Sequence, residues 1–139
     1  MADTDVTFAV IDPDTGDRFQ RLRRELGVQS FGLNLITLQS GQGSRVHVHE
    51  AQEEVYLVLE GELTLVIEGE DTTLARGRLA RVGPAVRRQL VNRGPDRAVL
   101  LALGGSGEHE ARDALAWGSW DEEGPGRASG DVPLPDDLV

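Results

Sequence analysis

The sequence contains no cysteine and no lysine, and it has few aromatic residues. Without cysteine the chain can form neither a disulfide framework nor a thiolate metal site. No stretch approaches the roughly 20 consecutive apolar residues of a membrane-spanning helix. The first residues also lack the basic segment and the apolar run of a secretory signal. We therefore expect a cytoplasmic protein that has no membrane partner.

Acidic residues outnumber basic ones, which gives a net charge of -10. This charge disfavours nucleic acid as a partner, because phosphates repel an acidic surface. All 14 basic residues are arginines, and seven of them fall between residues 76 and 97. Such a run is usually a solvated strand face. Coding bias is the simpler explanation for the absence of lysine. Guanidinium groups also suit a carboxylate or phosphate ligand, however, so the hypothesis of a small anionic ligand stays open.

A chain of 139 residues is large enough for one well-buried core and small for two. We divide it into an N-terminal arm with a short helix (residues 1–29), a barrel (residues 30–105) and a partly flexible C-terminal tail (residues 106–139). In the arm, the alternating residues 6–10 predict an edge strand or a loosely held segment. Helical spacing of apolar residues predicts a helix from Gly16 to Leu26 that stops at Gly27.

After Gly27 the apolar period changes from helical to two, which is typical of strands. Seven short segments, separated by glycine or proline turns, predict a β-sandwich or barrel. The predicted strands are Ser30–Leu38, Val55–Leu59, Leu63–Glu68, Thr72–Ala75, Leu79–Val82, Gln89–Asn92 and Ala98–Leu103.

The tail begins with a flexible glycine-rich turn, and residues 111–120 predict a short helix or an extended arm. Trp117 and Trp120 are the only tryptophans in the chain. We expect them to anchor the tail to the outside of the barrel, because packing is the usual role of such aromatics. After Glu123 the chain is poor in apolar residues, so we expect disorder or a partner contact there.

Two histidines and a carboxylate form the candidate site. His47 and His49 are two residues apart, so on a strand both imidazoles point to one face. Glu54 and Tyr56 share a face of the next predicted strand, whereas Glu53 faces outward. Two imidazoles and one carboxylate with open positions suit iron(II), and also manganese, zinc or nickel.

The run from Gly41 through His47, His49 and Glu54 to Gly61 resembles the first conserved motif of the cupin superfamily, G-x5-H-x-H-x3,4-E-x6-G, at all five fixed positions. This resemblance implies an all-β cupin fold, a jelly-roll or double-stranded β-helix barrel. It also implies that His47, His49 and Glu54 bind one divalent metal. Dimerisation is implied as well, with the edge strands or the arm as the natural contact.

The second cupin motif, G-x5-P-x-G-x2-H-x3-N, fits poorly. Gly77 and Asn92 match it, but Ala85 stands for the glycine and Arg88 for the histidine that would supply a fourth metal ligand. One hypothesis is that Arg88 replaces the cation, pairs with Glu54 through two hydrogen bonds and leaves the barrel without metal.

The other hypothesis keeps the metal on the two histidines and Glu54 and turns Arg88 toward an anionic substrate. Arg45 is a further candidate ligand-binding residue, and Tyr56 is a candidate proton donor or a wall of the pocket. His109 would have to fold back from the flexible turn to act as a ligand.

Two functions therefore stand open. The first is a cupin that holds a small anionic ligand inside the barrel beside a degenerate metal site. The second is a metal-dependent oxygenase, isomerase or lyase acting on a small organic acid. Whether the protein is an enzyme is left open, because cupins host many chemistries.

Overall fold

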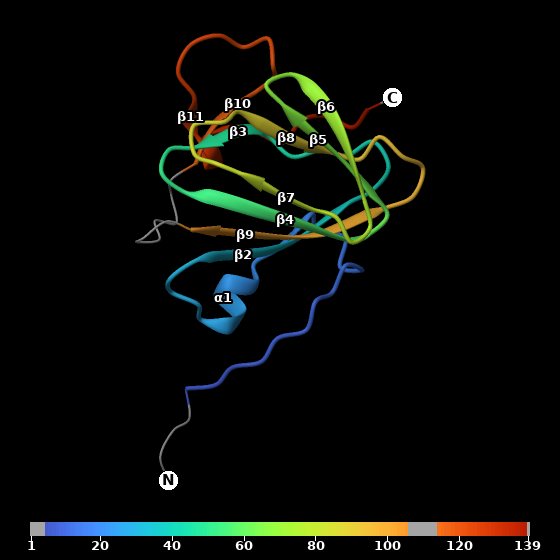
Figure 1. The fold of residues 1–139 in the computed structure, drawn as a ribbon, viewed down its shortest axis with the longest axis vertical. Coiled ribbons are helices and arrows are strands. Elements are labelled where there is room, and N and C mark those ends of the chain that lie inside the picture. Colours follow the sequence, from blue (N-terminus) through green and yellow to red (C-terminus); the bar gives the residue numbers. More distant parts are fainter. Residues whose placement is uncertain (1–4, 106–113, 139) are drawn as a thin grey trace.

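The computed structural model describes residues 5–105 and 114–138. They form two packed β-sheets, with one short helix beside the first sheet (Figure 1). The predicted all-β barrel is confirmed. In the part of the chain that is described, no helix is long and apolar enough to cross a membrane.

The first sheet has the strand order β1-β2-β9-β4-β7, and all its strands pair antiparallel. Its strands are β1 (Phe19–Gln20), β2 (Gly32–Leu38), β4 (Glu53–Glu60), β7 (Leu79–Val82) and β9 (Ala98–Gly105). The second sheet has the order β11-β10-β3-β8-β5-β6. Its strands are β3 (Val46–His49), β5 (Glu62–Ile67), β6 (Glu70–Ala75), β8 (Arg88–Val91), β10 (Ala114–Trp117) and β11 (Arg127–Ala128).

The core lies between the two sheets and is built from alternate residues of their strands. Its buried members are Ile36, Leu38, Tyr56, Val58, Leu63, Leu65, Val82, Leu90, Leu100 and Ala102. By this alternation Arg88 and Leu90 face inward, because Leu90 belongs to the core and Arg88 is fully buried.

The predicted helix from Gly16 to Leu26 is too long. Only α1 (Leu22–Leu26) is helical, and it ends as predicted at Gly27, which adopts a left-handed conformation with a φ of 73°. Phe19 instead belongs to β1, where it pairs with Ile36 and packs against the core. Burial of Phe19 against the sheet therefore overrides the helical spacing.

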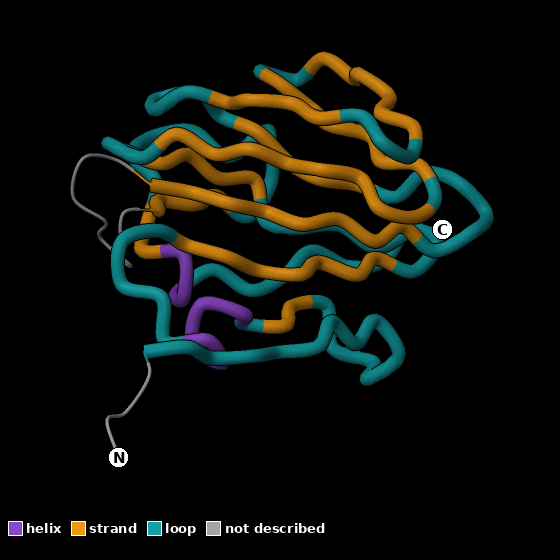
Figure 2. The backbone as a smooth tube through the Cα atoms, turned by 60° about the horizontal axis from the view of Figure 1, so that its bottom comes forward, coloured by secondary structure: helices purple, strands orange, loops and turns teal. Residues whose placement is uncertain are grey.

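The tail extends the second sheet at the edge next to β3. For residues 111–120 we predicted a short helix or an extended arm, and the described residues 114–120 form no helix. Instead β10 is extended and pairs with β3. The disorder that we expected after Glu123 is not found in the described residues. Residues 124–138 include β11 and the 3-10 helix η1 (Ser129–Asp131), and the side chain of Val132 is buried. The backbone N–H of Leu138 donates to the carbonyl of Gly41, which fixes the end of the tail (Figure 2).

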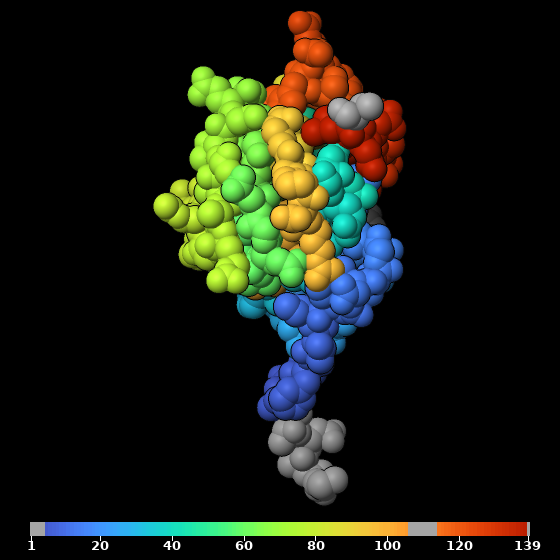
Figure 3. Space-filling model, turned by 90° about the vertical axis from the view of Figure 1, so that its right-hand side faces the viewer, coloured from blue at the N-terminus to red at the C-terminus, as the bar shows by residue number. Residues whose placement is uncertain are grey.

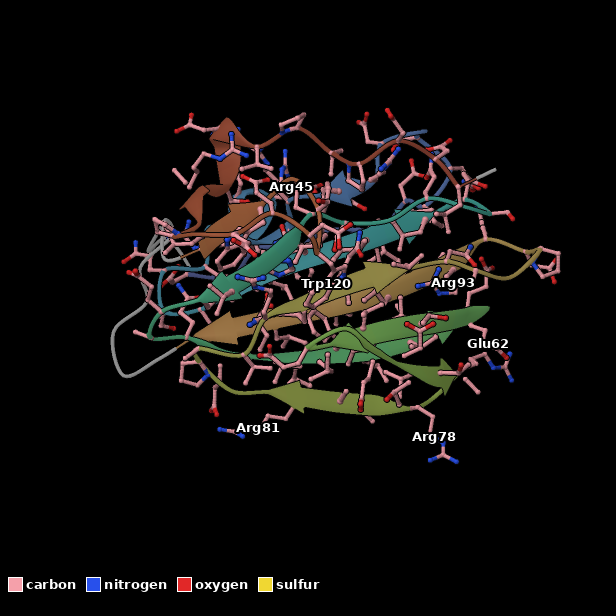
Figure 4. The ribbon with its side chains drawn as sticks, turned by 90° about the horizontal axis from the view of Figure 1, so that it is seen from above. Arg45, Glu62, Arg78, Arg81, Arg93 and Trp120 are labelled. Atoms are coloured by element: carbon pink, nitrogen blue, oxygen red, sulfur yellow. The ribbon has the colours of Figure 1, made fainter. Side chains whose placement is uncertain are left out.

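Both tryptophans attach the tail to the outer face of the second sheet, as expected. The guanidinium of Arg87 lies 3.8 Å from the ring centre of Trp117. The indole N–H of Trp120 donates to Gln89 at 3.0 Å, and Figure 4 shows Trp120 between the tail and the strands. Gln89 faces outward because its neighbours Arg88 and Leu90 face the core.

Candidate metal and ligand site

The two histidines lie on β3 and point into one end of the barrel. Register places His47 opposite Arg88 of β8 and opposite Ala116 of β10. His49 is opposite Ala114. Each imidazole is 14% exposed, so both can be reached from solvent. The predicted convergence of His47 and His49 is confirmed.

Glu54 supplies the carboxylate from the opposite sheet. Its Oε1 atom lies 3.6 Å from Nε2 of His47 and 3.2 Å from Nε2 of His49. On β4, Glu54 stands opposite Gly104 of β9, where a Cβ atom would approach the Cγ of Glu54 to 3.2 Å. The absence of a side chain at Gly104 therefore leaves room for the side chain of Glu54. Glu53 faces outward, as predicted, and pairs with Arg81 on the surface.

Arg88 lies behind Glu54, away from solvent. Its side chain is 0% exposed, and its Nη2 donates to Oε1 of Glu54 at 2.6 Å. The Nε of Arg88 donates to the hydroxyl of Tyr56 at 3.3 Å, and Nη1 donates to the carbonyl of Val86 at 2.8 Å. The hypothesised pair with Glu54 therefore forms through one N–H rather than two, because the other two nitrogens have different acceptors.

Tyr56 binds the same carboxylate as Arg88. Its hydroxyl donates to Oε1 of Glu54 and is buried beneath it. Burial and the negative charge of Glu54 raise the pKa of Tyr56 well above its usual range, against the opposing effect of Arg88. Tyr56 thus stays protonated and holds Glu54 in position. Tyr56 is therefore a positioning residue, because its hydroxyl already donates its hydrogen to Glu54.

The ionisation of Glu54 is set by two opposing effects. Burial acts to raise the pKa of this carboxyl, but hydrogen bonds and charge from His47 and His49 outweigh it and hold the pKa well below its usual range. Glu54 is therefore a carboxylate at neutral pH, and with the guanidinium of Arg88 it makes a charge-balanced pair.

The donor set fits a divalent transition metal. Ligand atoms of His47, His49 and Glu54 all lie within 4.8 Å of one another. Around an ion with bonds of about 2.1 Å, neighbouring ligands lie about 3.0 to 3.5 Å apart, close to the separations here. The carbonyl of Arg45, which can only accept, lies 2.9 Å from Nδ1 of His47. Nδ1 therefore carries a proton, and Nε2, which faces Glu54, is the nitrogen left to bind a metal, as in metal-binding histidines.

Arg45, another predicted candidate, lies away from the two histidines and Glu54. The Nε of Arg45 donates to the carbonyl of Val132, so this guanidinium fastens the tail. Burial lowers the pKa of Arg45 from its usual value. His109 falls outside the described residues.

Sequence reasoning missed several contributors. The carbonyl of Val86 accepts from Arg88, and no residue type signals a backbone acceptor. Asn34 is half-buried on the inward face of β2, opposite Ala102, which is itself opposite Tyr56. The period-two pattern of β2 could have revealed Asn34, because Ile36 and Leu38 share its face.

A cavity of about 500 Å³ opens beside His49 on the outside of the barrel. The remaining residues that line it are Val48, Glu50, Glu68, Ala85, Arg87 and Trp117. Ala85 lies in the turn before β8 with a φ of 65°, and its N–H donates to the carbonyl of His49 at 2.8 Å. A tight turn therefore precedes β8, although Ala85 stands in place of the motif's glycine.

Known proteins share this fold. The profile of the Cupin domain family matches residues 34–104. A sugar phosphate isomerase of the cupin superfamily from Silicibacter pomeroyi is 27% identical, with a TM-score of 0.65 over 84% of this chain and 78% of that one. A cupin protein from Bacteroides fragilis is 22% identical, with a TM-score of 0.66 over 78% of this chain and 91% of that one.

A Cupin 2 conserved barrel domain protein from Salinispora arenicola is 23% identical, with a TM-score of 0.59 over 70% of this chain and 82% of that one. These last two likenesses concern the fold alone. No curated protein sequence matches the chain. The family profile covers more than half of the chain and includes His47, His49, Glu54 and Arg88. The chain therefore belongs to the cupin domain family.

Proposed function

We propose that the barrel binds a small anionic molecule at His47, His49 and Glu54, beside a divalent transition metal held by the same three side chains. The observation that carries this proposal is the convergence of the two Nε2 atoms on one carboxylate oxygen, with Nδ1 of His47 bound to a carbonyl. Iron, manganese, zinc and nickel all suit such donors. When bound, the ion would polarise an oxygen of the ligand.

Charge explains why the ligand should be anionic. Glu54 and Arg88 balance each other, so a divalent cation would leave the site with a net positive charge. A divalent ion and a guanidinium 4 Å apart repel by about 8 kcal/mol at an effective dielectric of 20, but the carboxylate attracts both partners. Arg88 is fully buried, so it contributes its charge and orients Glu54 without touching the ligand.

For the reaction, we propose isomerisation of a phosphorylated sugar. The support is the name of the relative from Silicibacter pomeroyi and the anionic character of such a substrate. In this chain, Tyr56 and Arg88 would hold Glu54, and the half-buried amide of Asn34 would be available to orient the substrate. Fold alone does not fix the chemistry of a cupin.

A second candidate function is binding without metal, with Arg88 as the permanent cation. One specific observation favours it: Oε1 of Glu54 already accepts hydrogen bonds from Arg88 and Tyr56. A carboxylate with these two donors is stabilised without an ion.

Metal content decides between the two. Untagged protein is stripped with a chelator, titrated with Mn²⁺, Ni²⁺ or Zn²⁺ by calorimetry, and analysed for metal by mass spectrometry after dialysis. We expect about one ion per chain and at least a 100-fold loss of affinity in His49→Ala. The matched control is Glu53→Ala, which removes a neighbouring carboxylate that faces outward.

The opposite result has a clear signature. If the wild type binds no metal and Arg88→His acquires one ion per chain, the metal-based proposal is wrong and Arg88 acts as the cation. If metal binds but neither a sugar phosphate nor inorganic phosphate binds to the loaded protein, the metal site stands and the substrate class is wrong.

A further inference from the structure

The cavity of about 500 Å³ on the outside of the second sheet is assembled from four segments of the chain. They are the end of β3, the turn after β5, the turn before β8, and β10. Figure 3 shows the tail, in orange and red, beside the strands of this sheet. Small-molecule sites have volumes of roughly 300 to 1,000 Å³, so this cavity has a suitable size. Apart from His49, none of its lining residues belongs to the metal and ligand site.

Arg87 brings a guanidinium to this cavity, and the stack on Trp117 holds it in place. The central carbon of the guanidinium lies 3.8 Å from the ring centre. The indole is itself fixed, because it is buried and its N–H donates to the carbonyl of Gly124. Among the residues that the structure describes, this guanidinium has no ion pair and no hydrogen bond to an oxygen. Its N–H donors therefore remain for a carboxylate or phosphate group.

Glu68 brings a carboxylate to the same cavity. Its backbone N–H donates to the carbonyl of Arg87, and its Oε1 accepts from the backbone N–H of Arg87, both at 3.0 Å. These bonds fix Glu68 beside Arg87, but no ion pair joins their side chains in the described structure. Glu50, which is exposed, adds a second carboxylate to the lining. The cavity thus presents both signs of charge without pairing them.

Two residues of the wall adopt left-handed backbone conformations. Glu68 has a φ of 48° and Ala85 has a φ of 65°. In the described part of the chain, they are the only residues other than glycine with a positive φ. Such conformations are unfavourable for a residue with a Cβ and concentrate at functional sites. Both of them line one cavity, which supports a function for it.

The charges on the wall select a class of ligand. The two carboxylates would repel a simple anion, and Arg87 would repel a simple cation. A zwitterion satisfies both, because its anionic group can bind Arg87 while its ammonium group binds Glu68. The side chains of Val48 and Ala85 supply apolar surface in the same cavity. An α-amino acid with an apolar side chain combines these three features in one small molecule.

We propose that this cavity is a second binding site, which takes an apolar α-amino acid. The carboxylate of the ligand binds the guanidinium of Arg87, and its ammonium group binds the carboxylate of Glu68. Its side chain packs against Val48 and Ala85. The metal takes no part in this binding, so this proposal and the proposed function can fail independently.

Titration of metal-free protein with L-leucine, by calorimetry and fluorescence, tests this proposal. Trp120→Phe leaves Trp117 as the only tryptophan, so the fluorescence of this variant reports on the cavity wall. We expect saturable binding of L-leucine. Two probes that each lack one charged group, 4-methylpentanoate and isopentylamine, should bind at least tenfold more weakly. The absence of saturable heat and fluorescence change at tens of millimolar L-leucine would overturn the proposal. Equally tight binding of either probe would do the same.

Two substitutions test the roles of the charged residues. Arg87→Gln is expected to raise the dissociation constant of L-leucine at least tenfold. Glu68→Gln should raise it severalfold and reduce the preference over 4-methylpentanoate, while its amide oxygen can still accept from the backbone N–H of Arg87. The matched control is Arg78→Gln, because Arg78 projects outward just before β7 in the other sheet (Figure 4). Far-UV circular dichroism checks that each variant folds. A folded Arg87→Gln variant with unchanged affinity would contradict the proposed site.

Discussion

Tyr56 is the only tyrosine of the chain, so its ionisation can be followed without another phenol. Burial raises its pKa well above the usual value near 10, so the folded protein keeps the proton that the unfolded chain loses. We therefore expect no tyrosinate absorbance at 295 nm in the native protein at pH 10.5 to 11. The unfolded protein in concentrated urea should show the full signal there.

The same shift sets the direction of a stability change. The contribution of Tyr56 is complete below about pH 10 and declines as the pH rises from that value toward the folded pKa, because unfolding then releases a proton. Tyr56→Phe gives the baseline, since it contributes no phenol. A native wild-type protein that titrates near pH 10 would show that the hydroxyl is not held by Glu54.

Ala85 occupies a backbone conformation that favours glycine. Its φ of 65° costs a residue with a Cβ about 1 to 2 kcal/mol. Glycine would relieve that strain but would add roughly 0.4 to 1 kcal/mol of unfolded-state entropy. We expect Ala85→Gly to increase the free energy of unfolding by about 0.5 to 1 kcal/mol, measured by urea denaturation.

Ala75 serves as the matched control for this change, because it is an exposed alanine at the end of β6. Ala75→Gly should lower the free energy of unfolding by about 0.5 to 1 kcal/mol. Equal losses in both variants would show that the turn before β8 carries no strain.

At the scale of elements, β10 is an integral strand of the second sheet. It pairs with β3 from Ala114 to Trp117, directly beside the two histidines. Trp117 is buried, stacks with Arg87 and donates its indole N–H to the carbonyl of Gly124. We expect Trp117→Ala to cost about 3 to 4 kcal/mol in urea denaturation, as for other buried aromatics.

Trp120 offers the comparison within the same tail. It is only half-buried and makes one side-chain hydrogen bond, to Gln89, so Trp120→Ala should cost about 1 kcal/mol. A tail that merely rests on the barrel would give similar small losses for both tryptophans, and that result would contradict the assignment of β10 to the sheet.

Some elements were predictable and others were not, for physical reasons. Leu79–Val82 was predicted at its observed bounds, because glycine turns mark it on both sides. The β1 strand was missed because Phe19 satisfies helical and strand patterns equally, and only its contact with Ile36 decides. The sequence left residues 111–120 open between a helix and an extended arm, because β10 draws its stability from pairing with a distant segment.

At the scale of the whole molecule, the sequence was sufficient for the fold and for the two histidines and the glutamate of the site. Spacing placed His47 and His49 on one face, since two residues along a strand return to the same face, and the motif resemblance added Glu54 to them. It could not show that Arg88 would be fully enclosed, or that it would use one N–H for Glu54 and the others for Tyr56 and Val86. Those details depend on how closely the two sheets approach.

The site also joins the two layers of the barrel. His47, His49 and Arg88 belong to one sheet, whereas Glu54 and Tyr56 belong to the other. Any separation of the layers at this end must therefore pull the imidazoles and the guanidinium away from the carboxylate. A molecule that bound to groups of both sheets would therefore cross-link the two layers, and we expect it to slow their separation.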